Sequence, residues 1–443
     1  MPQYLIKYGD TLYSIARRFG ITLEQLLAAN PQIINPDMIY PGANIVIPSP
    51  TPAPGQMIYI VQRGDSLYSI ARRFGTTVDT LLRLNPNIKN ASLIYPGQQV
   101  NVPLPAPVTA PGCIIYVSTR TGKAEIWRSY AMGANPISLT GRSGETEQLY
   151  VSSSPQWSPD GRSIAFISMA DQIRVLNVMG PCGENKTVVA RQDVGSFSWS
   201  PDSTMIAFSN VQGTFVVTPG GEPRKVSDRL NGPQWYPDGK TLVGNTSIED
   251  INFAVLATVD ITGENFKPLV DPLIPGGLIR LSPDGRYAAI QLYSGSAYSF
   301  VSQVSVYDFL TGSLVRLSGT EFETEPGITR DISSLGGWSP DSTMLSYSTL
   351  VNPQGYSEIK IASPVGAILQ SYGRGFYANT GWGPTPDWII ITLSEQPGTN
   401  VFEATAPQNI YVLNIRTDRQ FKITSTGSNA FPDWVGTPCQ TCF

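Results

Sequence analysis

The stretch QWSPDGRSIAFIS, residues 156–168, joins a tight turn to an apolar strand, and most of this chain is built from copies of it. Proline fixes φ at the start of a turn, aspartate hydrogen-bonds back to the main chain, and glycine adopts the positive φ that ends the turn. The β-branched and aromatic residues that follow favour a strand. The stretch therefore predicts a β-hairpin, with one strand ending at Trp157 and the next beginning near Ile164.

Copies of this pattern recur after residue 112, each with an anchor residue, usually tryptophan, just before the turn. Consecutive anchors are 42, 36, 46, 57, 44 and 52 residues apart, which leaves room for four short strands, the content of a propeller blade. The sequence predicts an all-β propeller of seven blades, or of six if the irregular stretch 281–338 is misread. The anchors are Trp157, Trp199, Trp235, Leu281, Trp338, Trp382 and Trp434.

The two ends of this repeat region complement one another. Trp434 lies in a first strand with nothing after it. The segments CIIYVST, EIWRSY and ISLTG, which begin at Cys113, Glu125 and Ile137, provide three strands with no first strand before them. We therefore expect residues 113–443 to form one propeller, closed by pairing of its N- and C-terminal strands.

These repeats resemble those of TolB-type and WD-repeat-like propellers over about three-quarters of the chain. The resemblance implies the fold and little about function, because propellers serve as scaffolds, lectins and enzymes alike. TolB-like domains commonly present a face or a central channel to protein partners. TolB itself usually has six blades, so the seventh anchor argues against transferring its partners to this chain.

A second repeat opens the chain, where residues 4–48 align with residues 59–103 at a constant offset of 55 and without a gap. Of the 45 aligned positions, 24 are identical. Each copy predicts two small helices between two short strands, an α+β module. Pro-rich linkers follow both copies, so the expected domains are 1–48, 58–103 and 113–443, with linkers at 49–57 and 104–112.

The first copy carries start and stop signals for both helices. Asp10 or Thr11 can cap the first helix, and Gly20 stands where a left-handed residue ends it. Thr22 and Gln25 have the spacing of a capping box for the second helix. The helix stripe and the closing strand predict a core of Leu12, Ile15, Ala16, Phe19, Ile45 and Ile47.

The openings YLIKYGDTLYSIARRFG and YIVQRGDSLYSIARRFG, with NPxI and IYPG further on, resemble the LysM module along both copies. The resemblance implies binding of N-acetylglucosamine-containing glycans, peptidoglycan or chitin, in a shallow groove between two loops. An N-acetyl group offers one amide to exposed backbone and one methyl to an aliphatic side chain, and needs no charge. The implied glycan-binding residues are Gly9, Asp10, Thr11, Leu12, Ile33, Ile34 and Asn35, and Gly64, Asp65, Ser66, Leu67, Ile88, Lys89 and Asn90.

Helical spacing assigns several aromatic and aliphatic residues to the module cores and not to ligand contact. Asp10 and Asp65 are expected to act first as helix caps. Two linked modules would gain avidity on a polymer that reaches both. The expected core residues of the first helices are Tyr13, Ile15, Phe19, Tyr68, Ile70 and Phe74.

The four cysteines all fall in the propeller region. Alignment of the closing blade with its neighbour brings Cys113 and Cys439 side by side, and Cys182 lies on the same rim as Cys442. We expect disulfides Cys113–Cys439 and Cys182–Cys442, although four cysteines allow three pairings. A redox role for the terminal CQTC comes second, because no helix lowers its pKa, and zinc third, because there is no second CxxC.

Composition excludes several classes of function. Histidine is absent, which removes Ser-His-Asp and Cys-His catalysis and His-ligated metals. Net charge is −4, divided as +3 in residues 1–103 and −7 beyond, and neither part has the basic face that duplex nucleic acid requires. The best apolar run, Trp388–Leu393, is a buried strand and not a membrane span. Glu321, Glu323 and Glu325 are expected in a solvated loop, so we assign no catalytic residue, no cofactor and no metal ligand.

These observations predict a non-enzymatic protein that binds cell-wall glycan through its LysM modules and displays the propeller to an unknown protein partner. Two alternatives stay open: a structural subunit of a fibre or coat that self-assembles, and a propeller with lectin or enzyme activity. Disulfides imply an extracytoplasmic place of work at the cell wall, cell surface or spore coat. The N-terminus enters a folded pattern by residue 4 and shows no signal peptide.

Overall fold

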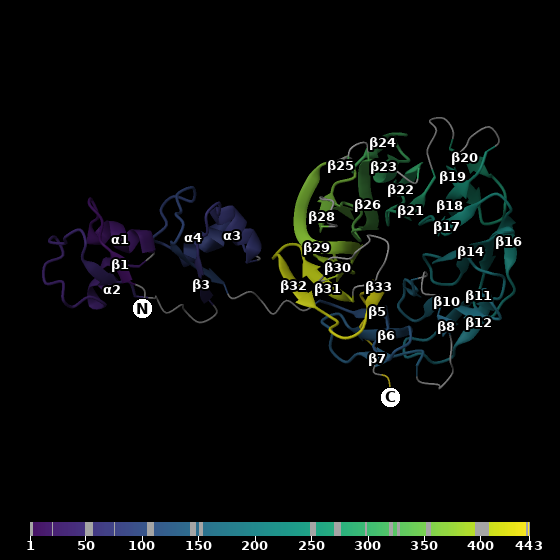
Figure 1. The fold of residues 1–443 in the computed structure, drawn as a ribbon, viewed down its shortest axis with the longest axis horizontal. Coiled ribbons are helices and arrows are strands. Elements are labelled where there is room, and N and C mark those ends of the chain that lie inside the picture. Colours follow the sequence, from purple (N-terminus) through teal and green to yellow (C-terminus); the bar gives the residue numbers. More distant parts are fainter. Residues whose placement is uncertain are drawn as a thin grey trace. The chain divides into compact units, whose positions relative to one another are not determined.

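The computed structural model describes residues 3–19, 21–48, 56–74, 76–103, 110–141, 148–149, 154–248, 254–269, 276–296, 299–318, 322–325, 328–350, 356–394, 407–439 and 442. The expected linkers fall largely outside these residues, as does Gly20. Two compact units make up the chain, Met1–Val108 with Ile415–Arg419, and Thr109–Asn414 with Gln420–Phe443. Figure 1 shows the small helical modules of the first unit and the ring of the second.

The first module has the predicted order of strand, two helices and strand. Its elements are β1 (Gln3–Leu5), α1 (Leu12–Phe19), α2 (Leu23–Ala28) and β2 (Asn44–Val46), and β1 pairs with β2 antiparallel. Thr22 and Gln25 form the predicted capping box on α2. Ile45 and Ile47 are each 2% exposed and pack with Leu12, Ile15 and Ala16 in one core, as predicted.

The second module repeats this arrangement. Its elements are β3 (Gln56–Ile60), α3 (Leu67–Arg73), α4 (Val78–Leu84) and β4 (Gln99–Pro103), with β3 and β4 paired antiparallel. The sequence prediction of the core is correct for Ile15, Ile70, Phe19 and Phe74 but wrong for the two tyrosines. Tyr13 and Tyr68 are 67% and 71% exposed, because each follows a buried leucine and so lies about 100° around the helix from the apolar stripe.

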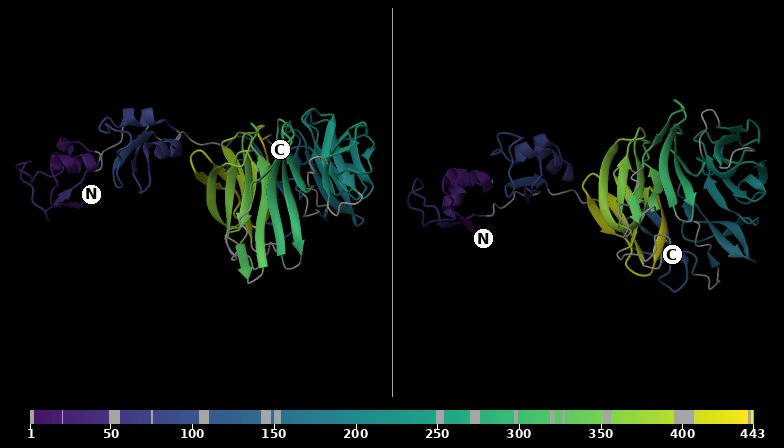
Figure 2. Two further views of the ribbon diagram at one scale, coloured as in Figure 1. Left: turned by 90° about the horizontal axis from the view of Figure 1, so that it is seen from above. Right: turned by 45° about the horizontal axis from the view of Figure 1, so that its top comes forward.

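The second unit is a ring of seven blades, each built on an antiparallel sheet of four strands. Neighbouring blades pack face to face, and Figure 2 shows the ring from two further sides. In Figure 1 the first strand of a blade lies toward the middle of the ring and the last toward its outside. The first blade consists of β33 (Asn429–Val435), β5 (Cys113–Ser118), β6 (Glu125–Tyr130) and β7 (Ile137–Ser138), and the second of β9 (Gln156–Trp157), β10 (Ile164–Ala170), β11 (Ile173–Met179) and β12 (Thr187–Ala190), with β8 (Gln148–Leu149) paired to β10. The third blade consists of β13 (Ser196–Trp199), β14 (Ile206–Asn210), β15 (Gly213–Val217) and β16 (Arg224–Ser227), the fourth of β17 (Asn231–Trp235), β18 (Thr241–Thr246), β19 (Val255–Asp260) and β20 (Lys267–Pro268), and the fifth of β21 (Leu278–Leu281), β22 (Tyr287–Ser296), β23 (Ser299–Asp308) and β24 (Leu314–Arg316). The sixth blade consists of β26 (Ile328–Trp338), β27 (Leu345–Leu350), β28 (Tyr356–Ala362) and β29 (Ile368–Trp382), and the long strand β29 also begins the seventh, which continues with β30 (Trp388–Ser394), β31 (Gln408–Asn414) and β32 (Arg419–Lys422).

The prediction of seven blades is confirmed, and the irregular stretch between Leu281 and Trp338 holds a full blade with long strands. Strands β22, β23 and β26 have 10, 10 and 11 residues, and β23 pairs with β26 in parallel, which joins two blades. Glu323 and Glu325 lie in the short strand β25 (Phe322–Glu325), paired with β26, and not in the expected loop. Glu321 lies outside the described residues.

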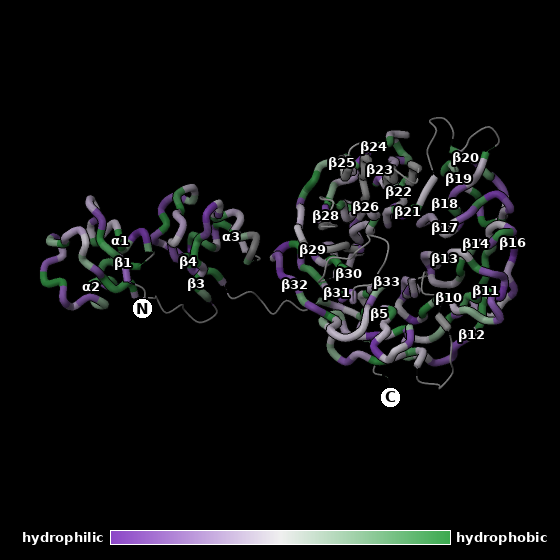
Figure 3. The backbone as a smooth tube through the Cα atoms, in the orientation of Figure 1, coloured by the Kyte–Doolittle hydropathy of each residue, from purple (hydrophilic) through white to green (hydrophobic). Residues whose placement is uncertain are grey.

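Packing between blades forms the core of the ring. Trp199 packs with Ile167 and Leu176 of the preceding blade, and Trp157 packs in the same way on Ile115 of the closing blade. Five of the seven anchors are buried, and Leu281 and Trp382 are half-buried. Hydrophobic stretches follow strands such as β10 and β31 in Figure 3.

The turns adopt the conformation that their sequence predicts. Gly161 has a φ of 70°, and Asp160 accepts hydrogen bonds from the Ser158 hydroxyl at 2.7 Å and from the Arg162 N–H at 3.1 Å. Where serine replaces this glycine, as at Ser203, φ is still positive, at 64°. The Ser203 hydroxyl accepts a hydrogen bond from the Asp160 N–H of the neighbouring blade at 3.0 Å, which offsets the backbone strain by tying two blades together.

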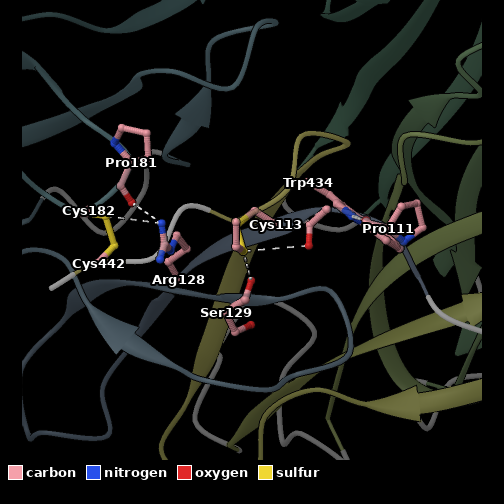
Figure 4. Close-up of a disulfide and its surroundings, with 10 residues drawn as sticks. Pro111, Cys113, Arg128, Ser129, Pro181, Cys182, Trp434 and Cys442 are labelled. Carbon is pink, nitrogen blue, oxygen red and sulfur yellow. Dashed lines mark hydrogen bonds between the residues drawn. A yellow bond between two sulfur atoms is a disulfide. The ribbon is translucent and has the colours of Figure 1, made fainter.

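The ring closes as its sequence predicts. Strand β33 pairs antiparallel with β5, placing Trp434 opposite Ile114. The disulfides are Cys113–Cys439 and Cys182–Cys442, with Cα–Cα distances of 5.1 and 5.5 Å (Figure 4). Both predicted pairings are confirmed, and the redox and zinc interpretations of the terminal cysteines are wrong.

Candidate glycan-binding sites

The loop between β1 and α1 is held in shape by Asp10. Gly9 turns the chain with a φ of 84°, and the Asp10 carboxylate then accepts hydrogen bonds from the Lys7 N–H and the Tyr4 hydroxyl, both at 2.8 Å. Arg18 lies 3.5 Å from the same carboxylate. Asp10 is therefore a brace for the loop, and its side chain is not the helix cap that was expected.

The second module has the same brace. Asp65 accepts hydrogen bonds from the Tyr59 hydroxyl at 2.6 Å and from the Gln62 N–H at 2.7 Å, and Gly64 has a φ of 93°. Two loops with one geometry, 55 residues apart, indicate that their shape is required by the module.

The brace makes the first module sensitive to acid. Burial disfavours the charge of Asp10, but the hydrogen bonds from Lys7 and Tyr4 outweigh it, so the pKa of Asp10 lies below its ordinary value. The ionised carboxylate therefore stabilises the fold above about pH 4, where an unfolded aspartate titrates, and this contribution is lost as pH falls through the lower pKa of the folded state.

We expect the stability difference between wild type and Asp10→Asn to be constant near neutral pH and to shrink below about pH 4. Thermal melts followed by NMR signals of residues 4–48 in the full chain measure it. Asp37→Asn, at an exposed position, is the matched control. A difference that persists unchanged to about pH 3 would contradict this account.

The helix caps fall one residue after the aspartates. The Thr11 hydroxyl accepts a hydrogen bond from the Ser14 N–H at 3.0 Å, and Ser66 does the same for the Ser69 N–H at 3.1 Å. The next residues, Leu12 and Leu67, are 2% and 1% exposed. Their side chains belong to the cores, so only the backbone of these two predicted site residues is available to a ligand.

The second predicted loop follows the second helix of each module. Ile33 packs against the first core, and Ile88 is 7% exposed in the second. Leu12 belongs to the same cluster as Ile33, and Leu67 to the same cluster as Ile88. In the first module, Ile34 is 96% exposed, so its aliphatic side chain lies outside the core.

Buried asparagines, which are not among the predicted site residues, hold these second loops. Asn30 is 0% exposed; its amide donates to Leu26 O at 2.8 Å and to Val46 O at 2.6 Å, and its oxygen accepts from the Val46 N–H at 2.7 Å. Asn85 repeats this between α4 and β4. The identical Asn-Pro pair in both copies is the signal that could have found them. The predicted site residues Asn35 and Asn90 shape the loops through turn hydrogen bonds to the N–H two residues on.

The two modules differ in charge at equivalent exposed positions. Tyr8 and Ile34 of the first correspond to Arg63 and Lys89 of the second at the offset of 55, and all four are exposed. Lys89 immediately follows the buried Ile88, and Arg63 immediately precedes Gly64. The second module therefore has two cations where the first has Tyr8 and Ile34, whereas the first has the exposed Lys7 where the second has Gln62.

The turn aspartates of the propeller are committed to structure. The Ser200 hydroxyl and the N–H and hydroxyl of Thr204 donate hydrogen bonds to the Asp202 carboxylate. These hydrogen bonds hold the pKa of Asp202 below its ordinary value. Among the residues that the structure describes, no cluster of three His, Cys, Asp or Glu could hold a metal ion. In the same ranges, no helix has the length and apolar character needed to cross a membrane.

Residues 4–48 and 59–103 both match the LysM domain family. The endolysin of Bacillus phage B103 is 41% identical over 99 residues, which cover 22% of this chain and 37% of that protein. The secreted LysM effector ECP6 of Passalora fulva is 38% identical over 102 residues, covering 23% of this chain and 44% of that protein. The chain thus spans less than half the length of these curated relatives.

Solved structures are similar to the propeller. TolB from Acinetobacter baumannii matches 76% of this chain and 74% of its own at 16% identity, with a TM-score of 0.42. A prolyl endopeptidase matches 72% of this chain and 49% of its own at 16% identity, with a TM-score of 0.48. With its family matches and its strand order, the chain carries two LysM domains, at residues 4–48 and 59–103, followed by a seven-bladed β-propeller.

Proposed function

We propose that this protein binds an N-acetylglucosamine-containing polymer of the cell wall through both LysM domains and presents its propeller, without enzymatic activity, to another protein. The observation that carries the proposal is the pair of braced loops in each domain. These loops offer exposed backbone, and in the first domain they also offer the exposed Ile34. Such a surface suits an N-acetyl group, whose amide needs backbone partners and whose methyl needs an apolar contact.

Peptidoglycan fits the second domain better than chitin does. Chitin is neutral, whereas peptidoglycan carries carboxylates on its muramic acid and peptide stems. Arg63 and Lys89 are exposed beside the second site. They attract carboxylates that come within the Debye length of physiological salt. The first site has one exposed cation in its helix-entry loop, Lys7, so we expect it to prefer peptidoglycan less strongly.

The covalent structure supports a place of work outside the cytoplasm. Two disulfides persist in oxidising compartments and here join segments 326 and 260 residues apart. Relatives of the LysM domains include a phage endolysin and a secreted effector. The location that we propose is the cell wall, the cell surface or a spore coat.

We expect the full-chain variant Ile34→Asp/Lys89→Asp to bind insoluble peptidoglycan about 10-fold or more weakly than wild type, since tenfold corresponds to about 1.4 kcal/mol. Each single variant should lose less affinity for peptidoglycan, because the other domain still binds the polymer. Co-sedimentation with peptidoglycan and, in parallel, chitin measures the effect. The control is Val211→Asp, at a propeller position that is 93% exposed.

Wild type that pellets with neither polymer would refute glycan binding. A double variant that pellets like wild type would place the site elsewhere on the domains. Self-association that depends on concentration and not on glycan would favour the coat or fibre subunit.

A further inference from the structure

The two disulfides of the propeller lie in different surroundings. In the first, Cys113 is 2% exposed and Cys439 packs against the same hydrophobic cluster of the closing blade. In the second, Cys182 and Cys442 are both half-buried. This second disulfide joins the loop between β11 and β12 to the C-terminal end of the chain. Both of its residues are therefore in part open to solvent.

A buried guanidinium lies against the second disulfide. Arg128 in β6 is 2% exposed, and its Nη1 is 3.8 Å from Cys182 Sγ. The same Nη1 donates a hydrogen bond to Pro181 O at 3.0 Å, which fixes the guanidinium beside the sulfur (Figure 4). A neighbouring cation favours the thiolate form of a cysteine. Arg128 therefore stabilises a negative charge on Cys182 Sγ when the disulfide opens.

One acidic group opposes this effect. The Glu184 carboxylate accepts a hydrogen bond from the Cys182 N–H at 2.7 Å. Glu184 is exposed, so water screens its charge. The guanidinium of Arg128 is buried, and charges act more strongly where less water lies between them. We expect the attraction by Arg128 to outweigh the repulsion by Glu184.

The first disulfide has no comparable advantage at either sulfur. Cys439 Sγ lies 3.5 Å from Ser129 O and 3.9 Å from Gly112 O, and the partial negative charges of these carbonyl oxygens oppose a thiolate. Cys113 shares an apolar cluster with Ile115, where burial disfavours the charged form of a thiol. Opening this disulfide would leave a thiolate in one of these two unfavourable places.

We propose that the Cys182–Cys442 disulfide is a site of exchange with small thiols, at which Cys442 is attacked and Cys182 leaves as a thiolate beside Arg128. Cys113–Cys439 stays intact and keeps the ring closed. This chemistry is not that of a terminal CxxC pair, because Cys439 and Cys442 are bonded to different partners. It is also independent of glycan binding by the LysM domains.

The exchange proceeds in two displacement steps. The sulfur of a small thiolate attacks Cys442 Sγ and forms a new S–S bond, while the Cys182–Cys442 bond breaks and its electron pair stays on Cys182 Sγ. A second small thiolate attacks the small-thiol sulfur of this mixed disulfide and releases the Cys442 thiolate. Two small thiols are thereby oxidised to one disulfide, and the protein disulfide is reduced to two cysteines. The protons that the small thiols lose pass to solvent and from there to the released thiolates.

Incubation of the full chain with 2-mercaptoethanol tests the proposal, because this thiol is uncharged and does not itself respond to Arg128 or Glu184. Free thiols are blocked with N-ethylmaleimide at timed intervals, and a non-reducing peptide mass map then identifies each cysteine's state. We expect Cys182–Cys442 to open about 10-fold or more faster than Cys113–Cys439. The first product should carry the mixed disulfide on Cys442 and the maleimide label on Cys182.

Two variants alter the charge at Cys182 in opposite directions. Arg128→Met removes the cation but keeps a long side chain, and should slow the opening about 10-fold and abolish the preference for Cys442. Glu184→Gln keeps an oxygen for the Cys182 N–H at an exposed position, and should speed the opening about 2- to 5-fold. Arg191→Gln, with a side chain 54% exposed, is the charge control and should open at the wild-type rate.

Tryptophan fluorescence, followed in the same samples, establishes that each variant is folded and that wild type stays folded while Cys182–Cys442 opens. The proposal is overturned if Cys113–Cys439 opens as fast as Cys182–Cys442, or if native fluorescence is lost at the rate of opening. It is also overturned if the first mixed disulfide forms on Cys182. If Arg128→Met does not fold, Glu184→Gln decides the effect of charge: an opening rate at or below that of wild type would contradict the proposal.

Discussion

Replacing all four cysteines by alanine should destabilise the propeller more than any point substitution in the ring. Each disulfide restricts the unfolded chain, and the stabilisation grows with the length of the loop it closes. The two disulfides join residues that are 326 and 260 positions apart. Loss of one pair, Cys113/Cys439 or Cys182/Cys442, is expected to cost about 2–5 kcal/mol.

Loss of both pairs should cost more than the sum of the two single-pair losses. While one disulfide remains, the C-terminal segment stays tethered to the start of the ring, so the other closes a shorter loop. Without either, the closure depends on non-covalent contacts: the pairing of β33 with β5, the packing of buried Trp434 and Val435, and hydrogen bonds such as that from the Trp434 indole to Pro111 O. The unfolded chain then regains the full conformational entropy of a chain without cross-links.

Guanidinium unfolding followed by tryptophan fluorescence measures these losses. All eight tryptophans lie between residues 127 and 434, so the signal reports the propeller and not the LysM domains. Reducing agent should shift the unfolding midpoint of wild type toward that of the quadruple variant. The midpoint of the quadruple variant itself should not change. Equal midpoints for wild type and the quadruple variant would show that the disulfides do not stabilise the closed ring.

Asn30→Ala should unfold most of the first LysM domain. The substitution leaves Val46 N–H, Val46 O and Leu26 O without the side-chain partner they have now. A buried polar group without a partner costs about 1–3 kcal/mol, and a domain of about 45 residues has a total stability of about 2–7 kcal/mol. The expected loss of about 2–4 kcal/mol is therefore comparable with the whole stability of the domain.

NMR spectra of the full chain, with hydrogen exchange of residues 4–48, measure this change. Asn85→Ala should do the same to the second domain and leave the first intact. Asn35→Ala is the matched control, because that side chain is exposed and accepts one turn hydrogen bond. Glycan binding by Asn30→Ala should fall to the level of one domain. Native hydrogen-exchange protection in this variant would contradict the prediction, because β2 would then be held by other contacts.

Local signals in the sequence were sufficient for the elements of the LysM domains and for the turns of the blades, but not for the short strand β25, which was expected to be a loop. The capping box of Thr22 and Gln25 formed as expected, because a cap depends on residues three apart. The turn before Ile164 formed with Gly161 at positive φ, since proline, aspartate and glycine act within one turn. Repetition then extended one correct local prediction to seven blades and two modules.

Side-chain exposure was less predictable where a residue borders the apolar stripe. Tyr13 and Tyr68 are apolar enough for a core, and only the packing of α1 and α3 against their sheets decided that they face solvent. The roles of Asp10 and Asp65 were also missed, because their partner tyrosines lie on the preceding strand and come within reach only when the module folds.

The sequence by itself determined the two LysM domains, the blade count, the closing strand and the disulfide pairing, because each follows from a repeat or from alignment of one repeat on another. Only the tertiary structure decided what meets across the fold: the asparagines that tie helix to strand, the tyrosines that donate to the loop aspartates, and the Trp157 N–H that donates to Asp433. Trp157 and Asp433 are 276 residues apart in the sequence. Their hydrogen bond exists only after the ring has closed and brought the C-terminal strand beside the start of the next blade.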